Sequence, residues 1–220
     1  MVTSSNRAVR KFIGREHLFT PGEYLIIPIS LNFWYTKESS KKNHNEGDEK
    51  DYNNLYNLVI HSSKEFFIEQ EMHHAFLLAD TMIQLCLQLG QPKKQDIPDA
   101  TVYALSKNWS GLIVVVENAS PHAYLHIEVE CLKSMNVVST RQTLCTVDSV
   151  PPCHRQVLIA LTHLEGSNGY SINYNISYRA SSNAMLNTWP RLEGQKITNS
   201  PGITKKTFGL HAPRSMFLFN

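Results

Sequence analysis

This sequence of 220 residues lacks long apolar runs and has no large excess of either basic or acidic residues. The longest apolar run is Leu112–Val116, far short of the roughly 20 residues that a membrane-spanning helix needs. Basic and acidic residues number 21 and 19, a net charge of +2, so no strongly basic face indicates nucleic-acid binding. These scarcities exclude a helical membrane protein and give no support to a nucleic-acid partner.

Cysteine is also sparse, and no two cysteines share a CxxC spacing. Four cysteines in this length are too few for a disulfide scaffold, so we expect free, mostly buried thiols at Cys86, Cys131, Cys145 and Cys153. The first twelve residues carry basic side chains but no apolar stretch behind them, which is unlike a secretory signal. We therefore expect an intracellular, cytoplasmic protein.

The residues that are present predict a mainly β fold with one helix. Helical spacing of apolar side chains from Met72 to Cys86 indicates an amphipathic helix, which Gly90 and Pro92 would end. A linker is predicted at Pro92–Asp99. Strands are predicted by β-branched, aromatic and alternating patterns at Tyr24–Ile29, Leu31–Tyr35, Leu55–His61, Glu65–Ile68, Leu112–Val116, Leu125–Cys131, Arg155–His163 and Tyr170–Tyr178.

Three further expectations concern individual strands and the end of the chain. Leu112–Val116 is continuously apolar, as in a strand buried on both faces. A glycine-rich turn at Gly166–Gly169 predicts a hairpin that joins the Arg155 strand to the Tyr170 strand. The tail 191–220 shows little periodicity and four more basic than acidic residues, which predicts loose packing.

No catalytic constellation is predicted. Cys153 and His154 are neighbours whose side chains would leave a strand on opposite faces, so they cannot pair as nucleophile and base. The pair His73 and His74 is not followed by a third metal ligand. Alternation in the strand explains His126, Glu128 and Glu130 as its solvent side.

A calcium site is only weakly indicated. The charged loop 36–52 holds the acidic residues Glu46, Asp48, Glu49 and Asp51, which are oxygen ligands of the kind calcium prefers. The same loop carries lysines, and no EF-hand pattern is present, so a solvated loop is the favoured reading. We predict no catalytic, cofactor or metal residue beyond these four weak calcium ligands.

An ordered series of short motifs resembles one protein family. The series is LIVVVEN at 112–118, AYLHIEVEC at 123–131, NVVSTR at 136–141, DSVPPCHRQVL at 148–158, LEG at 164–166 and GLHAPR at 209–214. It resembles the C-terminal domain of the small-optic-lobes calpains, the calpain fifteen type. The earlier segments FTPGEYLIIPISLNFW at 19–34 and YNLVIHSS at 56–63 resemble the end of a calpain-type β-sandwich.

The resemblance implies a fold and a domain order. We expect the end of a calpain-type β-sandwich over 1–70, with the charged loop 36–52 exposed, and a bridging helix with its linker over 71–98. A small-optic-lobes homology domain, an antiparallel β-sandwich-like module, is expected over 99–190, and a basic tail over 191–220. Met1 would then lie inside a longer parent protein.

The resemblance also implies a function. Its family members are calcium-dependent intracellular cysteine endopeptidases, whose protease core matches no segment of this chain. The chain is then a non-catalytic regulatory or interaction region whose partner is a protein, such as the protease core or a substrate. The alternative is an incomplete record of an active protease whose catalytic core, with its calcium, lies upstream of Met1. A weaker alternative is membrane recruitment through Lys41, Lys42 and the basic tail.

Overall fold

The computed structural model describes residues 14–28, 57–70, 75–94, 96–107, 109–163, 169–186 and 209–219, and these residues form a mainly β structure with one α-helix. The fold class predicted from the sequence is therefore confirmed. The loop 36–52, the predicted strand Leu31–Tyr35 and the pair His73 and His74 lie outside the described residues. No helix among the described residues has both the length and the hydropathy needed to cross a membrane.

The strands form two antiparallel sheets. The large sheet has the order β1-β2-β3-β7-β5, and β9 pairs with one end of β7. Its strands are β1 (Gln91–Lys94), β2 (Ala100–Leu105), β3 (Gly111–Asn118), β5 (Val137–Ser139), β7 (His154–His163) and β9 (Arg214–Ser215). The small sheet has the order β6-β4-β8, from β4 (Tyr124–Glu130), β6 (Cys145–Val150) and β8 (Asn175–Ser181).

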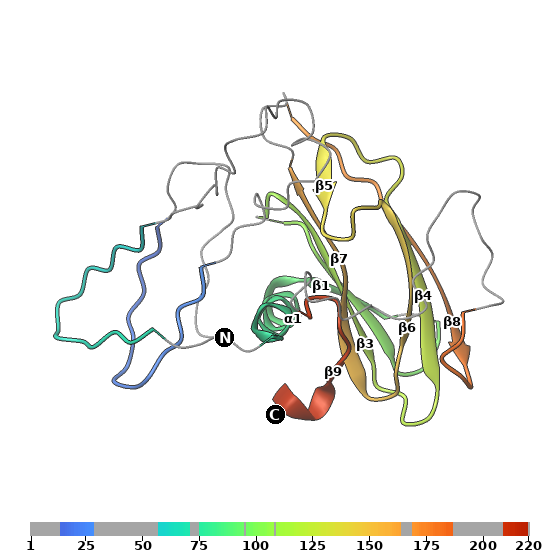
Figure 1. Ribbon diagram of the computed structural model, residues 1–220, viewed down its shortest axis with the longest axis horizontal. Helices are drawn as coiled ribbons and strands as arrows, with labels where there is room; N and C mark the ends of the chain where they lie inside the picture. Colours follow the sequence, from blue (N-terminus) through green and yellow to red (C-terminus); the bar gives the residue numbers. More distant parts are fainter. Residues whose placement is uncertain are drawn as a thin grey trace, which may run out of the picture.

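The helix α1 (Leu77–Leu89) and the small sheet cover opposite faces of the large sheet, which gives three layers (Figure 1). Side chains of β3 alternate between two apolar clusters: Val114 packs toward the small sheet, whereas Ile113 and Val115 pack toward α1. This explains the unbroken apolar run at Leu112–Val116 and confirms that the strand is buried on both faces.

The predicted helix is confirmed, with its described part over Leu77–Leu89. Ala79, Met82, Ile83 and Cys86 are buried on one face, as their spacing predicts. Asp80 lies in the first turn, where a carboxylate favours the helix dipole. Gly90 follows the last turn at a position where a Cβ would overlap the Cys86 carbonyl, so a glycine is required there.

The strand β7 contains a β-bulge that matters for the site described below. Ile159 pairs with Val114 and Val157 pairs with Val115, so Leu158 is an extra residue on β7. Leu158 and Ile159 therefore both pack toward the small sheet. A bulge of this kind disturbs the ladder locally and leaves backbone groups for other partners.

Two connections differ from the sequence-based predictions. Residues 92–94 were predicted as part of the linker Pro92–Asp99, but together with Gln91 they form the edge strand β1 paired with β2. Pro92 is tolerated because an edge strand has one side on which no ladder donor is needed. The predicted hairpin from Arg155–His163 to Tyr170 is wrong, because β7 and β8 belong to different sheets and β8 pairs with β4.

The described N-terminal segments and the chain end differ as well. The predicted strands Tyr24–Ile29, Leu55–His61 and Glu65–Ile68 are wrong over their described residues, since 24–28, 57–61 and 65–68 pair with no described strand and are almost all exposed. The predicted loose packing of the tail is wrong over 209–219, where Leu210 and His211 are buried and β9 pairs with β7. Residues 191–208 lie outside the described part of the chain.

A buried polar network as the candidate functional site

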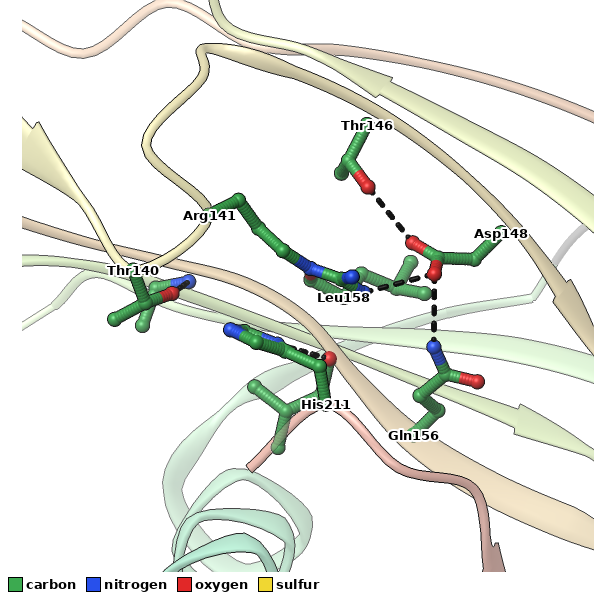
Figure 2. A network of polar contacts seen from close by, with 9 residues as sticks. Thr140, Arg141, Thr146, Asp148, Gln156, Leu158 and His211 are labelled. Atoms are coloured by element: carbon green, nitrogen blue, oxygen red, sulfur yellow. Dashed lines mark hydrogen bonds and ion pairs between the residues drawn. The ribbon is translucent and has the colours of Figure 1, made fainter. Parts of the chain in front are cut away.

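An ion pair is buried between the two sheets. Asp148 of β6 has a fully buried side chain, and Arg141, from the turn between β5 and β6, is 9% exposed. Arg141 Nη2 donates to Asp148 Oδ1 over 2.8 Å, as Figure 2 shows. The same oxygen accepts from Gln156 Nε2 at 3.1 Å, and the Thr146 hydroxyl donates to Asp148 Oδ2 at 2.8 Å. Both carboxylate oxygens therefore have partners.

Strand register explains why these polar side chains face inward. Asp148 pairs with Ile127, and Gln156 pairs with Val116, so both lie opposite residues of the apolar cluster between the sheets. The bulge at Leu158 contributes its carbonyl, which accepts from Arg141 Nε at 2.8 Å. One guanidinium thus connects β6 to β7 across the sandwich.

The electrostatics of the pair are those of a desolvated site. Burial raises the pKa of Asp148, while Arg141 and the donors from Thr146 and Gln156 oppose that rise. Removing each charge from water costs on the order of several kcal/mol. Only good geometry of the pair and further hydrogen bonds can offset this cost. Here the geometry is complete, so the ionised pair is the arrangement that the contacts favour.

His211 lies next to this network (Figure 2). Its side chain is buried, and Nδ1 donates to the Val157 carbonyl at 2.8 Å. Burial, assisted by the nearby Arg141 charge, lowers the pKa of His211 to about 3. The imidazole is therefore neutral in the folded protein at neutral pH.

This network holds strands together, and its geometry offers no reacting atom to a substrate. Its members bond to one another or to backbone of β7, and Asp148, Gln156 and His211 are all buried. Three of the family-like motifs supply these residues: NVVSTR ends in Arg141, DSVPP begins with Asp148 and GLHAPR contains His211. The motifs are thus explained by architecture.

The thiols lie in surroundings that suppress reactivity. Cys86 packs between α1 and the large sheet, and burial raises its pKa to about 12. Cys131 packs between the two sheets, where burial, with a smaller contribution from Glu130, raises its pKa to about 11. The expectation of free, mostly buried cysteines is confirmed, and only Cys153 is partly exposed. A nucleophilic cysteine needs the opposite shift.

Cys153 and His154 have separate partners. The Cys153 thiol lies 3.7 Å from the Ser120 carbonyl, and Cys153 itself has a positive φ of 55° just before β7 begins. His154 Nδ1 lies 2.6 Å from the Pro152 carbonyl and donates to it. Cys153 lies in the turn before β7, so the strand alternation assumed from the sequence does not apply to it, and each of the two side chains has a backbone partner of its own.

The predicted solvent face of β4 needs correction at His126. His126, Glu128 and Glu130 do share a face, but His126 is fully buried. Its Nε2 donates to the Asn183 carbonyl at 2.9 Å, and Arg179 Nε donates to its Nδ1 at 3.3 Å. Burial lowers the pKa of His126. The residues after β8 cover this position, which alternation in β4 alone could not indicate.

No metal centre is found within the described ranges, where no group of three or more His, Cys, Asp or Glu side chains is placed to hold an ion. The four weak calcium ligands Glu46, Asp48, Glu49 and Asp51 lie outside those ranges, so that prediction stays a prediction.

Asn118 is an architectural residue that the sequence did not single out. It ends β3, is 2% exposed, and its Nδ2 lies within 3.0 Å of three carbonyls, those of Ala123, Val150 and Pro151. It therefore joins the β3–β4 turn to the β6–β7 turn. Its position just after the apolar run Leu112–Val116, with only Glu117 between them, is the one sequence signal that could have indicated burial.

Comparison with known proteins bears on the module that contains the network. No solved structure matches the chain. Residues 85–184 match the family model of the calpain-D-like C-terminal domain. The matched range includes Arg141, Asp148 and every strand from β1 to β7, together with β8. The match supports a calpain-related C-terminal domain over residues 85–184.

Proposed function

We propose that this chain is the C-terminal regulatory and interaction region of a calcium-dependent intracellular cysteine endopeptidase of the calpain family. We assign it to the small-optic-lobes type, acting in the cytoplasm and itself non-catalytic. The observation that carries the proposal is the family match over 85–184, which coincides with a module built around an internal polar network. Such a module is suited to presenting a rigid surface to a protein partner.

The surroundings of the cysteines support a non-catalytic role. Two of the four thiols have pKa values raised to about 11 and about 12 by burial, and a third, Cys145, is also buried. A thiol protonated at neutral pH is a poor nucleophile.

Exposed apolar side chains in the N-terminal segments support an interaction role. Phe67 is 97% exposed and Leu18 is 94% exposed, and further apolar residues of 14–28 and 57–70 are at least 40% exposed. Large exposed apolar surface is typical of protein-binding sites. The occupant we propose is the rest of the calpain, whose sandwich and protease core these segments would contact.

The alternative is that the biological product is the active protease, with catalytic core and calcium upstream of Met1. The same family match favours it. Transcript sequence upstream of Met1 separates the two hypotheses: protease exons in frame would establish the alternative, and an in-frame stop codon without them would exclude it.

Binding to a purified protease core of a small-optic-lobes calpain tests the proposal. Isothermal titration should give saturable binding by the chain. Phe67→Asp or Leu18→Asp should weaken it tenfold or more, because each places a charge in an apolar contact. The matched control is Met135→Asp, a residue 65% exposed in the connection between β4 and β5. Equal binding by all variants, or none by the unchanged chain, would refute the proposed interaction.

A further inference from the structure

The last described segment, residues 209–219, runs along the edge of β7 beside α1 (Figure 1). We name this segment the strap. Its strand β9 pairs with His154 and Arg155 of β7, and the Met216 amide donates to the Cys153 carbonyl at 3.0 Å. Leu210 is fully buried in the cluster between α1 and the large sheet. The strap thus contacts both α1 and the large sheet.

Two polar side chains fix the register of the strap. Arg214 binds Asp80 of α1 through two bonds, of 2.6 Å and 3.0 Å, and its guanidinium lies 4.2 Å from the centre of the Phe76 ring. His211 donates to the Val157 carbonyl at 2.8 Å. A bidentate guanidinium–carboxylate pair and stacking on an aromatic ring both demand arginine specifically. Together with Leu210 these anchors define a Leu-His-x-x-Arg pattern.

The surface beneath the strap is incomplete without it. We name Phe76, Asp80 and residues 153–157 the strap-binding surface. β5 pairs with β7 only at 161–163 and β9 only at 154–155, so the Val157 carbonyl lies on a stretch of edge between these two strands. Removal of the strap would leave that carbonyl and the Asp80 carboxylate without the protein partners described above and would expose both to water.

Attachment of the strap is nevertheless limited. It shares two paired positions with β7, whereas β3 shares eight. The Arg214–Asp80 pair is 16% and 20% exposed, and Phe217 at the end of the strap is 73% exposed. Pairing of a short strand with an edge, together with side-chain anchors at fixed spacing, is how extended peptides bind to sheets.

We propose that the strap is a tethered peptide ligand and that the strap-binding surface is a peptide-binding site selective for the Leu-His-x-x-Arg pattern. The site opens locally while both sheets stay folded. Its resident occupant is the chain's own segment 209–219. This inference is independent of the proposed function.

Exchange of the occupant tests the proposal in the full chain. In the variant Leu210→Asp with Arg214→Ala the strap can no longer hold its place, and a labelled peptide of residues 209–217 should bind saturably by fluorescence anisotropy. Binding to the unchanged chain should be at least tenfold weaker, because the tethered strap competes at an effective concentration on the order of millimolar. Adding Asp80→Ala to the variant, or Arg214→Ala in the peptide, should weaken binding tenfold or more.

Native-state hydrogen exchange on the unchanged chain gives a second readout that needs no variant. Amides of the strap, such as those of Ala212 and Met216, should exchange by a local opening that depends little on denaturant, well before the β3 amides. The proposal is overturned if strap and β3 amides exchange together. It is also overturned if the folded variant fails to bind the peptide at millimolar concentration.

Discussion

At the scale of single residues, the buried Arg141–Asp148 pair connects β6 to β7. Its carboxylate is fully buried and its cation is 9% exposed, so water cannot replace either partner. Breaking such a pair from one side costs more than the pair contributes, because an uncompensated charge remains inside. Arg141 also bonds the Leu158 carbonyl at the β7 bulge, which makes it the more sensitive partner.

Replacing Arg141 with Ala should therefore lower the free energy of unfolding by about 3–5 kcal/mol, because it leaves the Asp148 charge unpaired. Urea unfolding followed by circular dichroism measures the loss. The control is Lys107→Ala at an exposed position, expected to change stability by no more than about 0.5 kcal/mol. Equal stability of the two variants would show that the buried pair has no structural role.

His211 predicts how stability depends on pH. Burial holds its folded pKa at about 3, below the value of 6.5 for a free imidazole, so only the unfolded chain takes up a proton between these limits. Stability from this group is therefore complete above pH 6.5 and is lost as the pH falls toward 3. Between pH 7 and pH 5 the loss amounts to about 2 kcal/mol.

Urea unfolding at both pH values measures this loss, with His211→Gln as the comparison. The variant should lose about 2 kcal/mol less than the unchanged chain over the same interval. His126, whose pKa is also lowered, titrates in both proteins and cancels in the comparison. An identical pH dependence in the two proteins would contradict the assigned state of His211.

At the scale of elements, periodicity in the sequence predicted which segments are regular better than it predicted their partners. The helix and the doubly buried β3 are confirmed, and the alternation of β4 holds except at the buried His126. The predicted hairpin between β7 and β8 is wrong because alternation indicates which side chains face solvent but does not indicate which strand is the pairing partner. The strand β1 was missed because Pro92 and two lysines are also typical of a linker.

The polar network could not have been predicted from composition. Arg141 and Asp148 belong to residue types that are mostly exposed, and nothing local distinguishes a buried member from a surface one. The motifs NVVSTR and DSVPP did mark the right residues, but only by resemblance. Their physical role appears once the register places Asp148 opposite Ile127, inside the sandwich.

Asn118 provides a test of the turns that close one end of the sandwich. Asn118→Asp keeps the size of the side chain but removes the amide donor to three carbonyls. The free energy of unfolding should therefore fall by about 1–3 kcal/mol. Thermal or urea unfolding measures it. Asn173→Asp, at an exposed position, is the matched control, and a loss no larger than that of the control would remove the proposed role of Asn118.

At the scale of the whole molecule, the folded unit extends beyond the family match on both sides. A fragment of 85–184 loses the buried residues Ala79, Met82 and Ile83 of α1, together with the strap, whose opening leaves both sheets folded. Each large buried side chain contributes about 1.5–3 kcal/mol, and a domain has only about 5–15 kcal/mol in total. We therefore expect 75–219 to unfold cooperatively in urea and 85–184 not to do so.

Equal cooperativity and equal midpoints for these two fragments would mean that the described N-terminal part of α1 is accessory to the sandwich. Tryptophan fluorescence and circular dichroism, recorded on the same samples, separate a cooperative transition from gradual melting.

The central claim is that this chain is an interaction region whose exposed apolar N-terminal segments contact the protease part of a calpain. Amide hydrogen exchange of the full chain, alone and mixed with a small-optic-lobes protease core in calcium, tests it most directly. The account predicts new protection within 14–28 and 57–70, with the strands of the two sheets unchanged. Absence of new protection in both segments, or protection confined to the sheets, would contradict it.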